Sequence, residues 1–292
     1  MTRATMTGTS TVLPTEASAR SAGRSGFVAR LRTLFRSRWM PYVTTPLLVV
    51  LFLIGWKIYA SVSGLSALVL PPPEAVGKAL LEQLGTPHVW TQHIWTTTYE
   101  TVAGLFWATV IGVPLGFVVG RSDALERIFR PFIVAMQVVP KVALVPIFIL
   151  WFGFGSTSKV VIAAMLAFFP IFTNTAFGVR SMPRGLEELA ASLRLSPWRR
   201  LIRFDLPYAL PFTLTGLELG VVVGMIGAIV GEYLGGDRGL GRYVVTLQNQ
   251  LLIAEMFGAI IIMSILGLLF YSVVRVSRQL LVPWHESVRI SR

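Results

Sequence analysis

A few charged side chains set inside long apolar runs are the residues of this 292-residue chain that could do chemistry. Lys141 lies between Pro140 and Pro146, Glu218 lies within a later apolar run, and Glu100 lies at the edge of an earlier one. A lysine near the middle of a bilayer costs about 2.5–3.5 kcal/mol on insertion scales, so such groups persist where they pair or line a wet cavity. We therefore expect these three charged residues and the two flanking prolines to line a path through a membrane: Lys141, Glu218, Glu100, Pro140 and Pro146.

Lys141 and Glu218 are the pair of opposite charges that the sequence suggests first. Two alternatives stay open, because the lysine could instead extend to a membrane interface and Glu218 could serve only to satisfy a neighbouring helix. Two prolines six residues apart bend or break the helix that contains them. Irregular backbone at membrane depth is tolerated only within protein or beside a water-filled cavity, so this segment should face the centre of a bundle.

Several kinds of catalytic site are missing from the sequence. The chain has no GxxxxGK[ST] loop for nucleotide phosphates and no combination of nucleophile and base. It has no cysteine, and its three histidines are scattered, which argues against a metal site. We expect a protein that is not an enzyme, with no metal and no cofactor of its own.

Composition indicates a membrane protein. Apolar residues make up 54% of the chain and charged residues 14%, whereas a soluble domain carries about 25% charged residues. A helix needs about 20 mainly apolar residues to span a bilayer. We predict an all-α integral membrane protein, a bundle of about six transmembrane helices. Their predicted ranges are 42–62, 100–120, 130–152, 159–179, 211–231 and 256–275.

The distribution of positive charge predicts the orientation. Most of the 26 basic residues fall in alternate connecting segments and in the two ends of the chain. Because positive residues resist translocation, both termini should be cytoplasmic in a multi-pass protein of the bacterial plasma membrane. The same pattern assigns the net charge of +12 to the membrane surface rather than to nucleic acid. It places Lys159 in an external loop.

The remaining divisions follow from local composition. Residues 1–40 read as a disordered basic cytoplasmic tail, with a transit peptide as the alternative. Residues 41–280 form the membrane domain, and 281–292 a cytoplasmic C-terminal tail. Residues 74–84 predict a short amphipathic helix after three prolines. Glycines repeat in the second and fifth spans, which favours close helix packing there or, alternatively, a path or sliding surface.

The segment 185–207, between the fourth and fifth spans, is amphipathic. Its apolar residues follow helical spacing up to Ser196-Pro197, which ends one short helix and starts another. A helix pair of this kind rests on the membrane surface or docks a soluble partner.

This segment resembles the EAA loop of the permease subunits of binding-protein-dependent ABC importers. Glu188, Ala190 and Phe204-Asp205-Leu206-Pro207 carry the likeness. Trp151-Phe152-Gly153-Phe154-Gly155 and the glycine-rich stretch 231–241 are similar to the nitrate/sulfonate/taurine branch, which includes riboflavin and pyrimidine-precursor permeases. The family usually has glycine at position 194, where this chain has Arg194. A glycine allows positive φ, so either the turn is built differently here or docking is altered.

The resemblance implies a homodimer of permeases, two cytoplasmic ATPase subunits that bind the ATP, and an extracytoplasmic solute-binding protein. It implies that the helix around Glu188 enters a cleft of the ATPase. The coupling residues carried over are Glu188, Ala190, Ala191, Arg194, Leu206 and Pro207. The expected function is that of the permease subunit of an ATP-driven importer for a sulfonate, nitrate, taurine or a pyrimidine or vitamin precursor.

Two other functions compete with this expectation. An ion-coupled secondary transporter could use Lys141, Glu100 and Glu218, but such folds commonly show inverted repeats and none is visible here. A membrane enzyme would need a catalytic constellation that the sequence lacks.

Overall fold

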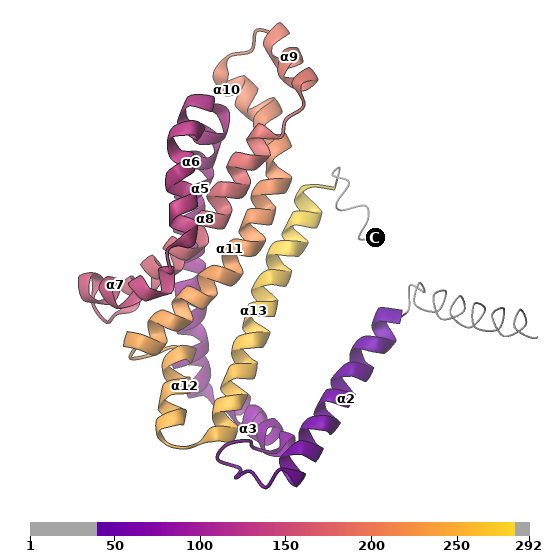
Figure 1. Cartoon of the computed structure of the whole chain (residues 1–292), viewed down its shortest axis with the longest axis vertical. Helices are drawn as coiled ribbons and strands as arrows, with labels where there is room; N and C mark the ends of the chain where they lie inside the picture. The colour runs from indigo at the N-terminus through magenta and orange to yellow at the C-terminus, as the bar shows by residue number, and fades with distance from the viewer. Residues whose placement is uncertain (1–39, 284–292) are drawn as a thin grey trace, which may run out of the picture. The chain divides into compact units, whose positions relative to one another are not determined.

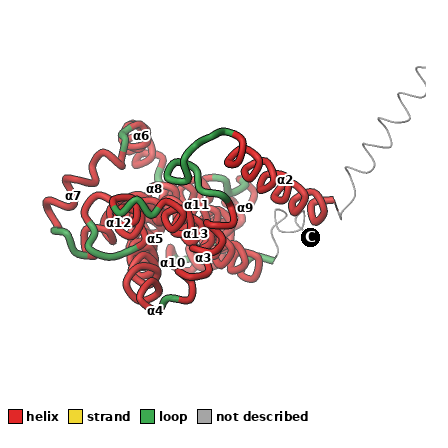
Figure 2. Tube along the Cα trace, turned by 90° about the horizontal axis from the view of Figure 1, so that it is seen from below, coloured by secondary structure: helices red, strands yellow, loops and turns green. Residues whose placement is uncertain are grey.

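The computed structural model describes residues 40–283, and nearly all of them are helical (Figure 2). The chain divides into two compact units, Met1–Gly64 and Leu65–Arg292. The tails expected at 1–40 and 281–292 fall almost entirely outside the described residues. Five described helices are long and apolar enough to cross a membrane, or six if one bent pair counts as a single span. The all-α membrane fold predicted from the sequence is therefore confirmed.

The described part of the first unit is helix α2 (Met40–Val62). It matches the span predicted at 42–62 and continues through Pro46. Most of its side chains are apolar around the whole circumference, as expected for a helix that spans a membrane.

Three long helices form the core of the second unit: α5 (Trp95–Arg121), α8 (Ser156–Arg180) and α11 (Leu206–Gly235). Helix α8 packs against both of the others (Figure 1). Ala108 of α5 meets Ala167 and Ile171 of α8 in a buried cluster. The predicted spans at 100–120, 159–179 and 211–231 all lie within these helices.

Glycines set how closely α5 and α11 approach α8. A Cβ on Gly104 would lie 2.5 Å from the Ala163 Cβ, and one on Gly216 would lie 2.8 Å from the Pro170 carbonyl oxygen. No side chain fits at either position, so the predicted role in close helix packing is confirmed.

The predicted third span is broken, as its prolines indicated. Helix α6 (Asp123–Val138) is followed by a 3₁₀ turn, η2 (Lys141–Leu144), and by α7 (Val145–Phe152), with a bend of 81°. None of the described residues of α6 is buried within one protomer, so the expectation that this part of the span faces the centre of a bundle stays a prediction. Helix α7 does contribute buried residues, Val145 and Ile149.

Short helices lie at the two ends of the core (Figure 1). At one end are α9 (Arg184–Ser192), α10 (Pro197–Arg200) and a π-helical turn, η3 (Leu201–Asp205), that leads into α11. We call this the α9 end.

The opposite end holds α3 (Pro73–Gly85), α4 (Pro87–Val89), the turn η1 (Trp90–Ile94) and α12 (Leu240–Asn249). We call it the α12 end. Helix α3 confirms the amphipathic helix predicted at 74–84. It packs on the last long helix, α13 (Ile253–Leu281), where Gln83 Nε2 donates to the Glu255 carbonyl oxygen at 2.7 Å.

Candidate coupling and translocation sites

The residues proposed to line a path do not come together. Glu218 of α11 pairs with Arg278 of α13, with 3.1 Å between Oε2 and Nη1. Lys141, on η2, instead lies over the ring of Phe169, 4.9 Å from its centroid. The suggested Lys141–Glu218 pair is therefore wrong. The sequence did not reveal the true partner, because Arg278 was assigned to the C-terminal cluster of positive charge.

Pro140 and Pro146 are exposed and flank the break in the third span. Their positions explain why Lys141 lies on a 3₁₀ turn rather than on a continuous helix. Whether this turn lines a path in the assembled protein stays a prediction.

Glu100, the remaining path candidate, belongs to a buried polar cluster at the α12 end. Its side chain is 2% exposed and lies next to Glu232 and Ser156. Its Oε2 has no hydrogen-bond partner among the described residues. Thr97 and Gly241 each donate a hydrogen bond of 2.7 Å to the Glu232 carboxyl group.

Lys159 is also in this cluster and is 1% exposed; it lies in the first turn of α8, so its assignment to a loop is wrong. Its Nζ donates to the carbonyl oxygens of Gly155 at 3.1 Å and Gly235 at 2.8 Å, and also to that of Phe154. The ammonium therefore satisfies carbonyl groups where the loop before α8 meets the end of α11. A single lysine at the start of an apolar run did not indicate this role in the sequence.

Outside the spans, Tyr243 of α12 stacks on His93 with ring centroids 4.5 Å apart. Burial raises the pKa of the Tyr243 phenol above its usual range, so this group stays neutral at physiological pH.

At the α9 end, a short exposed helix presents the residues carried over from the EAA-loop resemblance. Glu188 and Ala191 are exposed on α9, whereas Ala190 faces inward and is 2% exposed. Leu206 and Pro207 begin α11, so the segment leads directly into a core helix. This arrangement offers an acidic, protruding helix to a partner while anchoring it through Ala190.

Arg194, which stands where the family usually has glycine, adopts the backbone conformation of a glycine. Its φ is +47°, in the left-handed region that glycine favours. The chain therefore builds the same kind of turn with an arginine, at a cost of about 1–2 kcal/mol for a left-handed residue. Ser196-Pro197 starts α10 and does not replace the turn.

Asp205 is a functional candidate that sequence reasoning missed, although it lies inside the Phe204–Pro207 motif. It is buried, and it forms ion pairs with Arg121 at the end of α5 and with Arg200 of α10 at 3.6 Å. The three residues thus tie α5, α10 and the start of α11 together. They border a polar cavity of about 730 Å³ that also contains Glu187 and Glu188.

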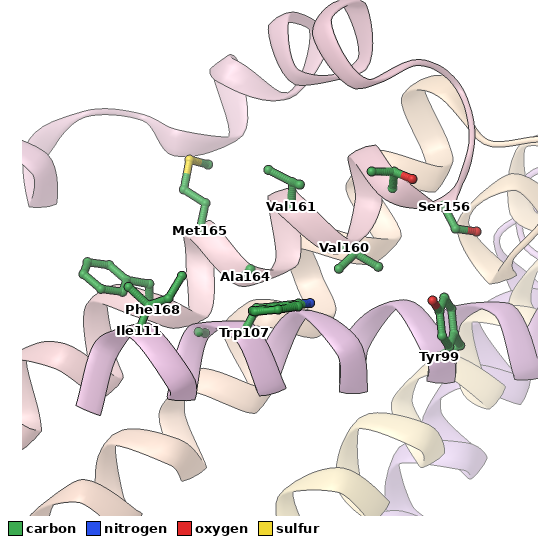
Figure 3. Close-up of a pocket in the computed structure, with 11 residues that line it drawn as sticks. Tyr99, Trp107, Ile111, Ser156, Val160, Val161, Ala164, Met165 and Phe168 are labelled. Atoms are coloured by element: carbon green, nitrogen blue, oxygen red, sulfur yellow. The ribbon is translucent and has the colours of Figure 1, made fainter. Parts of the chain in front are cut away.

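A second cavity, of about 680 Å³, lies along α5 and α8 (Figure 3). Trp107 and Ile111 of α5 face Val160, Ala164 and Phe168 of α8, and Tyr99 and Ser156 lie nearer the α12 end (Figure 3). This cavity is mostly apolar, and Lys141, Glu218 and Glu100 do not line it.

The fold and the two ends thus define a multi-pass membrane protein with an exposed helical segment at one end of its core. Comparison with known proteins gives the family. The model of the binding-protein-dependent transport system inner membrane component matches residues 112–286, which is more than half of the chain.

Three curated relatives align along most of their length. The riboflavin transport system permease protein of Chloroflexus aurantiacus is 33% identical and covers 88% of this chain and 96% of its own. The formylaminopyrimidine transport permease protein of Halalkalibacterium halodurans is 33% identical, with 82% and 95% covered. The taurine transport system permease protein of Escherichia coli is 32% identical, with 83% and 89% covered.

Among solved structures, the inward-facing methionine ABC transporter matches with a TM-score of 0.48 and 19% identity, covering 65% of this chain and 98% of that one. The family match and the curated relatives decide the assignment. The chain belongs to the binding-protein-dependent transport system inner membrane components, and it is the membrane-spanning permease of an ATP-driven importer.

Proposed function

We propose that this permease is driven by a separate cytoplasmic ATPase that docks on the α9 end. The observation that supports the proposal is the exposed helix α9, whose Glu188 projects while its Ala190 is buried against the core. A turn at 193–196 connects α9 to α10, and α10, η3 and α11 then follow one another without a loop, so force on α9 passes through this turn into the core. ATP is then bound by the partner, and the chain needs no cofactor of its own.

The proposed assembly is a homodimer of this chain with two ATPase subunits and an extracytoplasmic solute-binding protein. It places both termini and the α9 end in the cytoplasm, and the α12 end outside. Residues 41–280 act as the membrane domain in this assembly. The third span supports a second copy of the chain, since α6 leaves all its described residues unburied within one protomer.

The solute belongs to the small molecules that such importers carry. Riboflavin, formylaminopyrimidine, taurine and aliphatic sulfonates, the solutes in the names of relatives, form the panel to test. An ion-coupled mechanism through Lys141, Glu100 and Glu218 gains no support, since Glu218 pairs with Arg278 and Glu100 lies in a separate cluster.

The test is ATP-dependent uptake of that panel by cells that express this chain with its ATPase and binding protein. Glu188→Lys should abolish uptake, because a cation replaces the carboxylate at the contact. The amount of chain in the membrane should stay the same, because Glu188 is exposed.

Glu82→Lys is the matched control. It makes the same charge change on α3, at the far end of the core, at a side chain that is 65% exposed. Full uptake by the Glu188→Lys variant would rule out the docking role, and ATP hydrolysis by the purified chain alone would rule out a separate ATPase.

A further inference from the structure

The start of α12 is held by a carboxyl group from a different helix. Glu232, near the end of α11, is completely buried. Its Oε2 accepts a hydrogen bond from the Gly241 N–H at 2.7 Å, in the first turn of α12, and its Oε1 accepts one from the Thr97 hydroxyl of α5 at 2.7 Å. The Thr97 oxygen in turn accepts from the Leu240 N–H at 2.9 Å. We call Thr97, Glu232 and Gly241 the α12 latch.

The backbone around the latch is packed so closely that no side chain fits at Gly239 or Gly241. Gly239 has a φ of +95°, and a Cβ there would lie 2.2 Å from Glu232 Cδ. A Cβ on Gly241 would lie 2.3 Å from the Ile229 carbonyl oxygen. The Gly239 N–H also donates to the Gln92 carbonyl oxygen at 3.1 Å. The carboxyl group therefore rests directly on the backbone that begins α12, with two donors fixed on its two oxygens.

Glu232 lies at the opposite end of α11 from residues 185–207, which we call the coupling segment. The 30 residues of α11 are continuous helix, about 45 Å long at 1.5 Å per residue. Immediately before it, Asp205 pairs with Arg121 at the end of α5. Near its other end, Glu232 bonds to Thr97 at the beginning of α5. Acidic side chains thus fasten the α5–α11 pair at both ends, and each end adds a short helix: Asp205 also pairs with Arg200 of α10, and the α12 latch includes α12.

We propose that Glu232 and Thr97 are positioning residues that make α12 move as one body with α5 and α11. This inference rests on the proposed function, in which an ATPase moves α9. Motion of α9 then reaches the external surface through α11 and the latch, and not through the loop Gly236–Gly239 alone. Loss of the latch uncouples ATP hydrolysis from uptake without preventing assembly.

Thr97→Val is the sharpest variant, because it keeps the shape of the side chain and removes both the donor to Glu232 and the acceptor for Leu240. Thr98→Val is the matched control on the same turn of α5, since among residues 40–283 the Thr98 hydroxyl bonds only to the Ile94 carbonyl oxygen, at 2.7 Å. Thr97→Ser restores the hydroxyl and should rescue the defect.

Each variant is measured in the complete transporter in nanodiscs. The chain contains no cysteine, so spin labels can be placed at Phe106→Cys of α5 and Gln248→Cys of α12, both exposed positions. For the wild type, Thr98→Val and Thr97→Ser, the α5–α12 distance should stay narrow and unchanged when MgATP and vanadate trap the closed ATPase. In Thr97→Val the distance distribution should broaden.

The second readout is the amount of solute taken up per ATP hydrolysed. It should fall about tenfold in Thr97→Val, the effect of losing one buried hydrogen bond. The ATP hydrolysis rate and the yield of assembled complex should stay at the wild-type level.

The inference is overturned if Thr97→Val behaves like Thr98→Val in both readouts. It is also overturned if the ATP hydrolysis rate, the yield of assembled complex and solute uptake all fall together in Thr97→Val. That result would show that Thr97 only stabilises the fold. A wild-type complex that takes up no solute with ATP contradicts the proposed function instead, and the spin-label distances then still decide whether α12 is fixed to α5.

Discussion

The two ends of the core are built in opposite ways. At the α9 end, charged groups lie partly exposed around a polar cavity, with the Arg121 side chain 38% exposed beside the buried Asp205. At the α12 end, Glu232 and Thr97 are fully buried and bonded to the backbone. Polar groups that remain hydrated can exchange partners at little cost, whereas buried ones cannot. The α9 end is therefore suited to docking a partner, and the α12 end to transmitting motion rigidly.

The largest difference in stability between the two ends should come from one added methyl group. Gly241→Ala should destabilise the chain by about 3 kcal/mol, since its Cβ meets the Ile229 oxygen and the Glu232 side chain. Gly185→Ala on α9 meets nothing within 4 Å and should be neutral or slightly stabilising. Thermal unfolding of both variants in the same detergent tests this, and equal midpoints would contradict the contrast.

Asp205→Asn should have the next largest effect. Removing the charge leaves Arg121 and Arg200 without their carboxylate and should cost about 2 kcal/mol, less than in a fully buried pair because Arg121 is partly exposed. It should also lower ATP-driven uptake, because the coupling segment loses its attachment to α5. The exposed Asp123, which pairs with Arg180 at 2.9 Å, provides the control Asp123→Asn. Similar losses of stability and uptake in Asp205→Asn and Asp123→Asn would show that Asp205 does not specifically attach the coupling segment to α5.

The smallest effect on stability should be a stabilisation. Arg194→Gly relieves a left-handed residue and should stabilise the chain by about 1 kcal/mol. Leu251→Gly, at the α12 end, relieves a φ of +58° in the same way and should give the same gain. Because the turn at Arg194 already has the geometry of a glycine, ATP hydrolysis should be the same in both variants. A changed hydrolysis rate in Arg194→Gly alone would mean that the arginine contacts the ATPase.

The sequence predicted the elements well, because each depends on local signals. Long apolar runs, the prolines at 140 and 146 and the glycine stripes gave the spans, the broken helix and the close packing around α8. The partners of charged residues were not predictable in the same way. Glu218 meets Arg278 some 60 positions away, and Lys159 meets the end of α11. Such pairs depend on which helix faces lie together, which periodicity in one segment does not specify.

The residues of the candidate sites also differ in whether a local sequence signal identifies them. Glu188, Ala190 and Arg194 could be proposed from the sequence because a short local pattern identifies them, and their coupling role stays a prediction. Thr97 was missed because a threonine in a run of threonines gives no signal, and its role appears only when α5, α11 and α12 are assembled. Asp205 had a signal in its motif, but its two arginine partners come from separate elements.

In the proposed assembly, the α9 segment faces the cytoplasm, where an ATPase binds it. A single cysteine at the exposed Glu187 in this cysteine-free chain can be labelled with a membrane-impermeant maleimide. We expect labelling in inverted membrane vesicles, protection from labelling when the ATPase is present, and no labelling in intact cells. Labelling of Glu187→Cys from outside intact cells would contradict it.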